Sequence, residues 1–273
     1  KSIVRLNPDK PSGEIKNGRI LFDGKNITEL TEKEMQKIRA KEIRMIFQDP
    51  MTALNPTLTI GTQLMEPIML HQNCGKKEAW TRAVDVLKRV GIAAPEKRMK
   101  EYPHQLSGGM RQRVMIAMAV SCEPRLLIAD EPTTALDVTI QAQILELMCE
   151  LREKMGTAIM LITHDMGVVA ETADDVLVLY AGKAVEYGSI EDIFERPKHP
   201  YTQGLLNSIP RLDEDVELLN TIEGTVPAPD AMPAGCRFAP RCPYGKDRCM
   251  KEKPGVYHAG NSLVSCFRYE GEK

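Results

Sequence analysis

Two short stretches of the sequence combine residue types suited to bind phosphate and to move a proton. The run Leu126–Pro132 (LLIADEP) places Asp130 and Glu131 directly after apolar residues that are typical of a buried parallel strand. Asp130 is suited to organise Mg²⁺ through its water shell, and Glu131 is placed to accept a proton from an attacking water. A strand that simply ends in acidic residues is an equally common interpretation of this stretch.

The second stretch is Leu106–Arg113 (LSGGMRQR). Its Ser107, Gly108 and Gly109 expose backbone N–H groups where a helix over 110–120 is predicted to begin, and such a helix N-terminus binds anions. A plain helix cap is the alternative, because Ser and Gly both favour that position. Ser107 lies 23 residues before Asp130, and the pair of stretches is far more specific than either alone.

In this order the stretches resemble the signature and Walker B motifs of ATP-binding-cassette (ABC) ATPases, which are P-loop enzymes. Three further segments match the same family. Phe47–Pro50 resembles its Q-loop, Ala135–Asp137 its D-loop, and Ile162–Asp165 its switch-histidine segment. Taken alone, His164 is more typical of a surface or structural histidine. Its place in the series favours the ABC interpretation.

The resemblance implies a role for each matched residue. Glu131 is the general base, His164 contacts the γ-phosphate of ATP, and Gln48 joins them in the catalytic set. Lys1 contacts the β- and γ-phosphates. The Mg²⁺ ligands that it implies are Ser2, Gln48 and, through water, Asp130.

The resemblance also implies that the working unit is a dimer. Ser107, Gly108 and Gly109 contact the nucleotide of the opposing cassette, and Asp137 helps to join the two halves. The second ATPase subunit is a copy of this chain or a homologue.

The assignment of Lys1 and Ser2 depends on where the chain begins. A P-loop ends in Gly-Lys-Ser or Gly-Lys-Thr and leads into a helix, and Ile3–Leu6 fits the start of that helix. We therefore expect that the sequence is truncated inside this motif, with its glycines and the preceding strand upstream. An accidental Lys-Ser start is the alternative. Without the glycine cradle we expect this span to bind ATP weakly and to hydrolyse little.

These motifs require a sheet that brings strand ends together. Strands separated by helices predict an α/β fold with ligands at the carboxyl ends of the strands. The predicted strands cover 18–23, 43–47, 126–130 and 158–163, with a hairpin over 175–188. The predicted helices cover 31–41, 76–90, 110–120 and 140–151.

The composition changes after about residue 190, where prolines become frequent and four of the seven cysteines cluster. We predict an ABC nucleotide-binding domain over 1–190, with a helical subdomain at about 50–122, and a loop-rich C-terminal region over 191–273. Gln48–Pro56 (QDPMTALNP), His199–Thr202 (HPYT) and the tail resemble ATPases of oligopeptide and dipeptide importers. In that family the helical subdomain receives the coupling helices of two membrane permease subunits.

The tail cysteines are spaced by five, six and sixteen residues, which differs from the paired C-x₂-C spacing of common zinc sites. Four thiolates that converge can ligate an iron–sulfur cluster. The resemblance to dipeptide-type ATPases implies a [4Fe–4S] cluster, and disulfides are the structural alternative. The four positions are Cys236, Cys242, Cys249 and Cys266.

The overall composition limits the classes of function. The formal net charge is −2, which argues against a nucleic-acid binder that works by bulk positive charge. The expected function is peptide uptake driven by ATP hydrolysis at the cytoplasmic face of the membrane, supplied indirectly by an extracytoplasmic solute-binding protein. Alternatives are a soluble ABC ATPase without a membrane partner, a related importer for nickel or glutathione, and an iron–sulfur sensor on a degenerate cassette.

Overall fold

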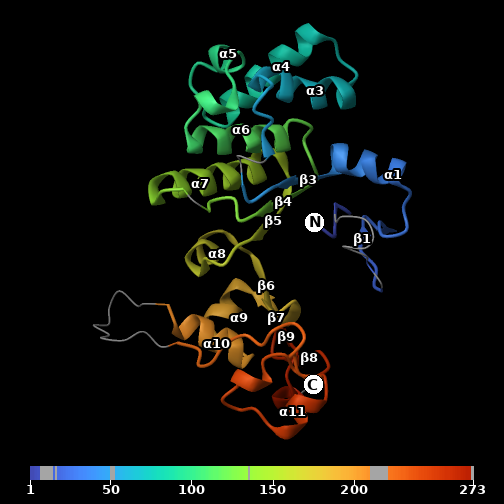
Figure 1. Ribbon diagram of the computed structural model, residues 1–273, viewed down its shortest axis with the longest axis vertical. Helices are drawn as coiled ribbons and strands as arrows, with labels where there is room; N and C mark the ends of the chain where they lie inside the picture. The colour runs from blue at the N-terminus through green and yellow to red at the C-terminus, as the bar shows by residue number, and fades with distance from the viewer. Residues whose placement is uncertain (7–14, 16, 50–52, 135, 210–220, 272–273) are drawn as a thin grey trace. The chain divides into compact units, whose positions relative to one another are not determined.

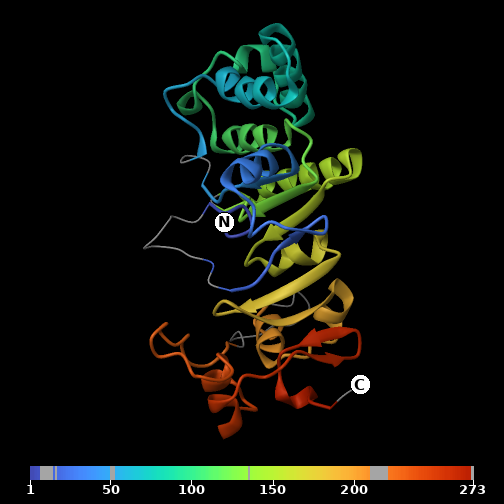
Figure 2. The same ribbon diagram turned by 90° about the vertical axis from the view of Figure 1, so that its right-hand side faces the viewer.

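The computed structural model describes residues 1–6, 15, 17–49, 53–134, 136–209 and 221–271 (Figures 1 and 2). The chain forms two compact units, Lys1–His164 and Asp165–Lys273, and each is described by itself.

The first unit is built on a parallel sheet of β3 (Ile43–Ile46), β4 (Leu126–Asp130) and β5 (Ala158–Ile162), in the order β3-β4-β5. The middle strand β4 pairs on both edges, and its residues 127–129 are at most 1% exposed. A strand enclosed in this way needs a continuous apolar run, which explains the sequence of β4. Because the strands are parallel, their carboxyl ends lie at one edge of the sheet.

Helices cover this sheet and extend the unit on one side. Their bounds are α3 (Ile60–Gln72), α4 (Lys76–Arg89), α5 (Pro95–Arg98), η2 (Pro103–Gln105), α6 (Gly108–Val120) and α7 (Val138–Met155). Both views place α6 between the group α3–α5 and the strands (Figures 1 and 2). A single apolar cluster runs from Leu64 and Leu87 through Ile116 to Leu127 and Ile144, all at most 1% exposed. The helical group therefore shares a core with the sheet that carries the acidic pair.

The N-terminal part of this unit contains a small hairpin and a capped helix. Strands β1 (Leu21–Phe22) and β2 (Lys25–Asn26) are joined by a turn at Asp23 and Gly24 with positive φ angles of 52° and 75°. Helix α1 (Glu32–Lys37) begins with a capping box between Thr31 and Glu34 and continues as a π-helix, η1 (Ile38–Glu42). The helix predicted to begin at residue 31 is confirmed, with its start within one residue.

The second unit is organised by an antiparallel sheet in the order β6-β7-β9-β8. The predicted hairpin is present as β6 (Asp175–Tyr180) and β7 (Lys183–Ser189), and β7 pairs with β9 (Ser262–Val264), which pairs with β8 (Tyr257–Ala259). Residues 165–190 therefore pack with the C-terminal region through this pairing. The remaining elements are α8 (Met166–Thr172), α9 (Ile190–Glu195), α10 (Pro200–Asn207), η3 (Ala239–Arg241), α11 (Asp247–Lys251) and η4 (Phe267–Tyr269).

Aromatic side chains form the centre of the second unit. Phe238 is 2% exposed, and its ring lies edge-on to Tyr180 with the ring centroids 5.1 Å apart. Tyr201 and the buried His199 pack on the same ring. Burial lowers the pKa of His199 to about 4, so this histidine is a neutral core residue. The tail thus has its own core in addition to its loops.

None of the helices in the described part of the chain is long and apolar enough to cross a membrane.

Candidate active site

Glu131 directly follows β4 in an unusual backbone conformation. Its φ angle is 46°, in the left-handed region that residues other than glycine seldom adopt. The backbone N–H of Glu131 donates to the carbonyl of Ile162 at the end of β5, with an N···O distance of 2.8 Å. This bond holds the sharp turn through which the chain leaves the sheet.

The carboxylate of Glu131 contacts three side chains, which lie after the carboxyl ends of β3, β4 and β5. The amide nitrogen of Gln48, which follows β3, donates to Oε2 of Glu131 at 2.8 Å, and the hydroxyl of Thr134 donates to the same oxygen at 2.9 Å. Nδ1 of His164, which follows β5, lies 3.3 Å from Oε1. The structure therefore brings together the three residues that the sequence places in the catalytic set.

Hydrogen bonds to this carboxylate favour its charged form. They lower the pKa of Glu131, with Thr134 as the largest cause and His164 the next, while desolvation opposes them and Gln48 has the smallest effect. The carboxylate is therefore ionised at neutral pH, which is the state required of a proton acceptor. A depressed pKa stabilises the folded state above the ordinary pKa of a glutamate, and that stabilisation is lost as the pH falls through the lowered value.

Thr134 is the site residue that the sequence did not reveal. It lies three residues after Glu131, and nothing in its type or spacing distinguishes it from a loop threonine. Gln112 was also missed. It is 2% exposed on α6, and its amide donates to the carbonyl of Pro132, so α6 is tied to the loop behind Glu131.

Oxygen groups near Glu131 fit a hard cation. Asp130 ends β4, and Asp130 pairs with Ile162 in the register of the sheet. Because the amide nitrogen of Gln48 faces Glu131, its amide oxygen points elsewhere as an acceptor. A carboxylate and an amide oxygen are the ligand types that Mg²⁺ prefers, so these residues suit that ion.

The first six residues form a turn, so the expectation of a helix start over Ile3–Leu6 is wrong. The N–H of Leu6 donates to the carbonyl of Lys1 at 3.1 Å, and Arg5 has a φ angle of 50°, which a right-handed helix does not allow. Val4 is 2% exposed and packs with Ile43 of β3. The turn thus lies against the same sheet, and both Lys1 and Ser2 are exposed.

The start of α6 lies open. Ser107 caps the helix, accepting from the N–H of Met110 at 3.4 Å. A Cβ atom on Gly108 would meet nothing within 4 Å, whereas one on Gly109 would lie 2.9 Å from Cγ2 of Ile140. In the described part of the chain no hydrogen bond joins Ser107 to Gln48, Glu131 or His164.

The D-loop segment begins α7. Asp137 caps that helix by accepting from the N–H of Ile140 at 3.0 Å, and the next residue, Val138, is 83% exposed. Ala135, which belongs to the same predicted segment, lies outside the described residues.

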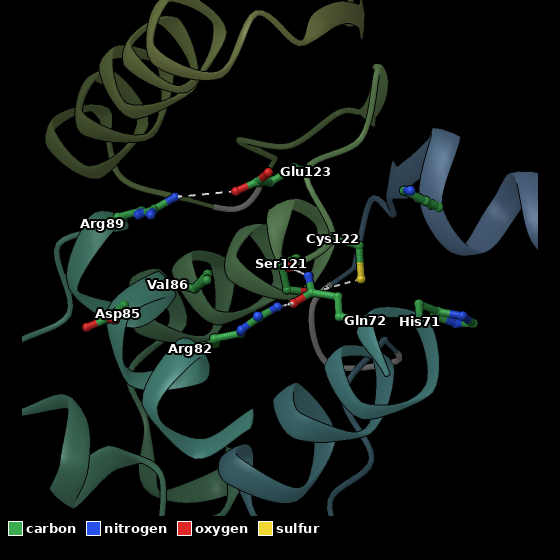
Figure 3. Close-up of a pocket in the computed structure, with 10 residues that line it drawn as sticks. His71, Gln72, Arg82, Asp85, Val86, Arg89, Ser121, Cys122 and Glu123 are labelled. Atoms are coloured by element: carbon green, nitrogen blue, oxygen red, sulfur yellow. Dashed lines mark hydrogen bonds and ion pairs between the residues drawn. The ribbon is translucent and has the colours of Figure 1, made fainter. Parts of the chain in front are cut away.

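A pocket of about 520 Å³ lies between α3, α4 and the turn after α6 (Figure 3). Its arginines are paired within the chain, since Arg82 contacts Glu78 at 2.6 Å and Arg89 contacts Glu123 at 4.0 Å. The amide nitrogen of Gln72 donates to the carbonyl of Ser121 at 2.9 Å. Both arginines of the pocket therefore have carboxylate partners within the chain, and Glu131 remains the candidate centre of chemistry.

All seven cysteines are free thiols, and the four in the tail influence one another. Burial raises the pKa of Cys236, Cys242 and Cys266, and the neighbouring thiolates raise it further. Among the described residues, no group of three or more His, Cys, Asp or Glu side chains is arranged to hold a single metal ion.

Two family models match the chain. The ABC transporter model matches residues 6–134, and the model for the oligopeptide/dipeptide transporter C-terminal region matches residues 185–249. Solved ABC cassettes have a similar fold. The chain aligns with a dimeric cassette, MJ0796, bound to ADP and phosphate, with a TM-score of 0.58 and 29% identity over 64% of this chain and 74% of that chain. For cbiO1 of Clostridium perfringens the TM-score is 0.58, with 32% identity over 66% and 69%.

Curated relatives are more similar in sequence. The chain is 57% identical to the oligopeptide transport ATP-binding protein AppD of Bacillus subtilis, over 100% of this chain and 84% of the relative. It is 53% identical to the dipeptide transport protein DppD of the same organism, over 98% and 80%, and 53% identical to OppD of Escherichia coli, over 92% and 76%. The chain therefore belongs to the ABC ATPases, as a member of the ATP-binding subunits of the oligopeptide/dipeptide transporter family.

Proposed function

We propose that this chain hydrolyses ATP at the edge of the β3-β4-β5 sheet and thereby drives the uptake of peptides. One observation carries the proposal: the carboxylate of Glu131 is held by Gln48 and Thr134 and faces His164 at the ends of three parallel strands. This arrangement suits the activation of one water molecule beside a phosphate.

In the proposed mechanism Glu131 accepts the proton of the water that attacks the γ-phosphorus. Gln48 and Thr134 both bind Oε2 and so fix the orientation of the carboxylate, while Oε1 faces His164. The His164 side chain is 79% exposed, which allows it to contact the γ-phosphate. Geometry and ionisation thus favour the same proton acceptor.

Mg²⁺, when bound, neutralises charge on the β- and γ-phosphates. Gln48, Asp130 and Ser2 would hold it, and Lys1 would contact the same phosphates. Each of these residues presents an oxygen or an ammonium group of the required type. These assignments rest on the matched motifs and on the positions of Gln48 and Asp130 beside Glu131.

A second cassette completes the proposed site. The open N-terminus of α6, with Ser107, Gly108 and Gly109, is suited to bind the phosphates held by an opposing subunit. Asp137 and the exposed Val138 lie at the start of α7 and would contact that subunit. The partner is either a second copy of this chain or a homologous ATPase.

The remaining partners follow from the transporter family. Two membrane permease subunits would dock on the helical subdomain, at about 50–122, so the ATPase lies peripherally at the cytoplasmic face of the membrane. An extracytoplasmic binding protein would deliver the peptide. In this proposal residues 1–190 form the ABC nucleotide-binding domain, and residues 191–273 form the C-terminal region of the transporter family.

Transport assays test the choice of solute. In vesicles that contain the assembled transporter, we expect di- or oligopeptides with their binding protein to stimulate ATP hydrolysis and to accumulate inside. Nickel and glutathione serve as comparison solutes. Stimulation by either of these but not by peptides would contradict the peptide assignment.

We also propose that the tail holds a [4Fe–4S] cluster on Cys236, Cys242, Cys249 and Cys266. The N–H of Cys236 donates to the carbonyl of Cys249 at 2.8 Å, which supports the approach of these two cysteine stretches. A single tetrahedral zinc ion would hold its sulfurs about 3.8 Å apart, given Zn–S bonds of about 2.3 Å. Among the described residues no group of His, Cys, Asp or Glu side chains is arranged to hold one such ion, whereas four cysteines can ligate an iron–sulfur cluster.

Metal analysis tests the cluster. Anaerobic purification of the full chain is expected to give about four iron and four sulfide per protein, as the cluster type requires. A colourless protein that contains zinc and no iron would contradict the proposal.

A further inference from the structure

The segment that carries Cys266 is held to the Cys242 loop by a side-chain stack. The guanidinium carbon of Arg268 lies 4.1 Å from the centroid of the Tyr244 ring. Arg268 is two residues after Cys266, and Tyr244 is two residues after Cys242. The contact therefore spans two separate cysteine-bearing stretches.

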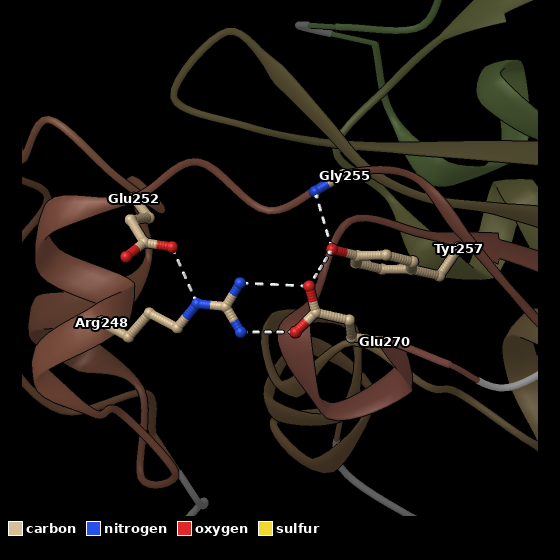
Figure 4. A network of polar contacts seen from close by, with 5 residues as sticks. All are labelled: Arg248, Glu252, Gly255, Tyr257 and Glu270. Atoms are coloured by element: carbon tan, nitrogen blue, oxygen red, sulfur yellow. Dashed lines mark hydrogen bonds and ion pairs between the residues drawn. The ribbon is translucent and has the colours of Figure 1, made fainter.

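A second stack joins the same segment to the Cys249 helix. Arg248, directly before Cys249 on α11, lies with its guanidinium carbon 4.0 Å from the centroid of the Phe267 ring. Its two terminal nitrogens donate to the carboxylate of Glu270, and its Nε donates to Glu252 at 2.8 Å (Figure 4). Such a fork-to-fork pair fixes the plane of the guanidinium, which a lysine would not do.

The Glu270 carboxylate is itself fixed by the β8 hairpin. The Tyr257 hydroxyl donates to Oε1 of Glu270 at 3.3 Å and accepts from the N–H of Gly255 at 3.3 Å (Figure 4). Arg248 therefore belongs to a polar network that also contains Glu252, Glu270 and Tyr257.

The backbone supplies the remaining connection. The N–H of Cys236 donates to the carbonyl of Cys249 at 2.8 Å. A Cβ atom on Gly235 would lie 2.3 Å from that same carbonyl oxygen, so the two stretches approach as closely as glycine permits. All four cysteine stretches are therefore connected, and Cys266 depends on side chains for its connection to Cys242 and Cys249.

We propose that Arg248 and Arg268 are positioning residues that hold Cys266 within the group of four thiols. Arg248 stacks on Phe267, and Arg268 stacks on Tyr244. Each of these two contacts, called a clasp below, joins the Cys266 segment to a neighbouring cysteine stretch. The consequence for metal binding rests on the proposed cluster, whereas the clasps themselves belong to the protein without iron.

Thiol labelling of the iron-free full chain tests the clasps. Alkylation by iodoacetamide, followed by peptide mass spectrometry, gives a rate for each cysteine, with Cys149 as an internal reference. We expect Arg248→Gln or Arg268→Gln to accelerate labelling of Cys266 roughly two- to fivefold, and the double variant at least about tenfold. Lys251→Gln removes a charge from the same helix without touching a clasp and should leave the rate unchanged.

Substitutions of Tyr244 distinguish the effect of aromatic stacking from the effect of side-chain size. Tyr244→Phe keeps the aromatic face and should label like the unmodified chain, whereas Tyr244→Leu should label like Arg268→Gln. Unchanged labelling of Cys266 in both arginine variants, with folding verified by circular dichroism, would overturn the proposal.

Cluster stability provides the second measurement. If the unmodified chain takes up iron and sulfide, both clasp variants should lose the visible cluster absorption severalfold faster in air. Equal lifetimes would overturn the positioning role. If the unmodified chain takes up no iron, the cluster proposal fails, and the labelling experiment alone decides whether the clasps hold Cys266.

Discussion

Glu131 concentrates the unusual features of the first unit in one residue. It combines a left-handed backbone, three polar neighbours and a lowered pKa. A non-glycine residue in this conformation costs on the order of 1 kcal/mol, and the bond from its N–H to Ile162 compensates for part of that. The left-handed backbone of Glu131 directs its carboxylate differently from an ordinary right-handed or extended backbone.

The hydroxyl of Thr134 is predicted to tune this carboxylate. In Thr134→Val the largest cause of the lowered pKa disappears, so the pKa of Glu131 should rise toward its ordinary value. The acid limb of the pH–rate profile of the assembled transporter should then move to higher pH, with at most about a tenfold loss of rate at neutral pH. Thr139→Val, an exposed change on α7, is the matched control, and an unmoved acid limb would contradict this role.

At the scale of elements, the sequence predicts the strands that form the site. The buried run 126–130 matches β4, and the segments at 43–47 and 158–163 match β3 and β5 within one residue at each end. Continuous apolar runs and the acidic residues that follow them are strong local signals. The convergence of Gln48, Glu131 and His164 follows from parallel pairing, which the βα alternation implies.

Other elements lacked such signals. The hairpin β8–β9 is only three residues long in each strand and has mixed polarity, so the tail was predicted as loops. The turn over Lys1–Leu6 depends on a left-handed Arg5, and no residue type announces that conformation. Thr134 and the arginine clasps are contacts between side chains, and their geometry appears only once the backbone is in place.

The two glycines that begin α6 differ in their surroundings and give a stability prediction. A Cβ on Gly109 would press against Ile140 at 2.9 Å, whereas a Cβ on Gly108 meets open space. We expect Gly109→Ala to lower the free energy of unfolding by about 1 kcal/mol relative to Gly108→Ala, because the clash outweighs the higher helix propensity of alanine. Denaturant titration of both variants measures the difference, and equal stabilities would show that Ile140 moves aside freely.

For the whole molecule, the proposed ATPase site requires a second cassette. A Cβ on Gly108 at the start of α6 meets open space, and Val138 is left exposed at the start of α7. In the proposed dimer, each chain contributes residues to two different nucleotide sites. The sequence predicts this only through family resemblance, since no local pattern specifies a partner surface.

A single charge tests the dimer. Gly108→Asp fits the open space at the start of α6 but would repel the phosphates of an opposing nucleotide. In a Glu131→Gln background, light scattering should show dimers on addition of ATP, and Gly108→Asp should abolish them. Gly75→Asp places the same carboxylate in open space at the N-cap of α4 and is the control. Persistent ATP-dependent dimers in Gly108→Asp would contradict the proposed interface.

Glu131 is the proposed proton acceptor in ATP hydrolysis. A single-turnover measurement on the assembled transporter, with radiolabelled ATP, tests it most directly because binding and chemistry are read separately. For Glu131→Gln we expect ATP to be retained as in the unmodified transporter and ADP to form at least about 100-fold more slowly. Glu146→Gln, an exposed change on α7, should behave like the unmodified transporter. Formation of ADP by Glu131→Gln at the unmodified rate would contradict the account.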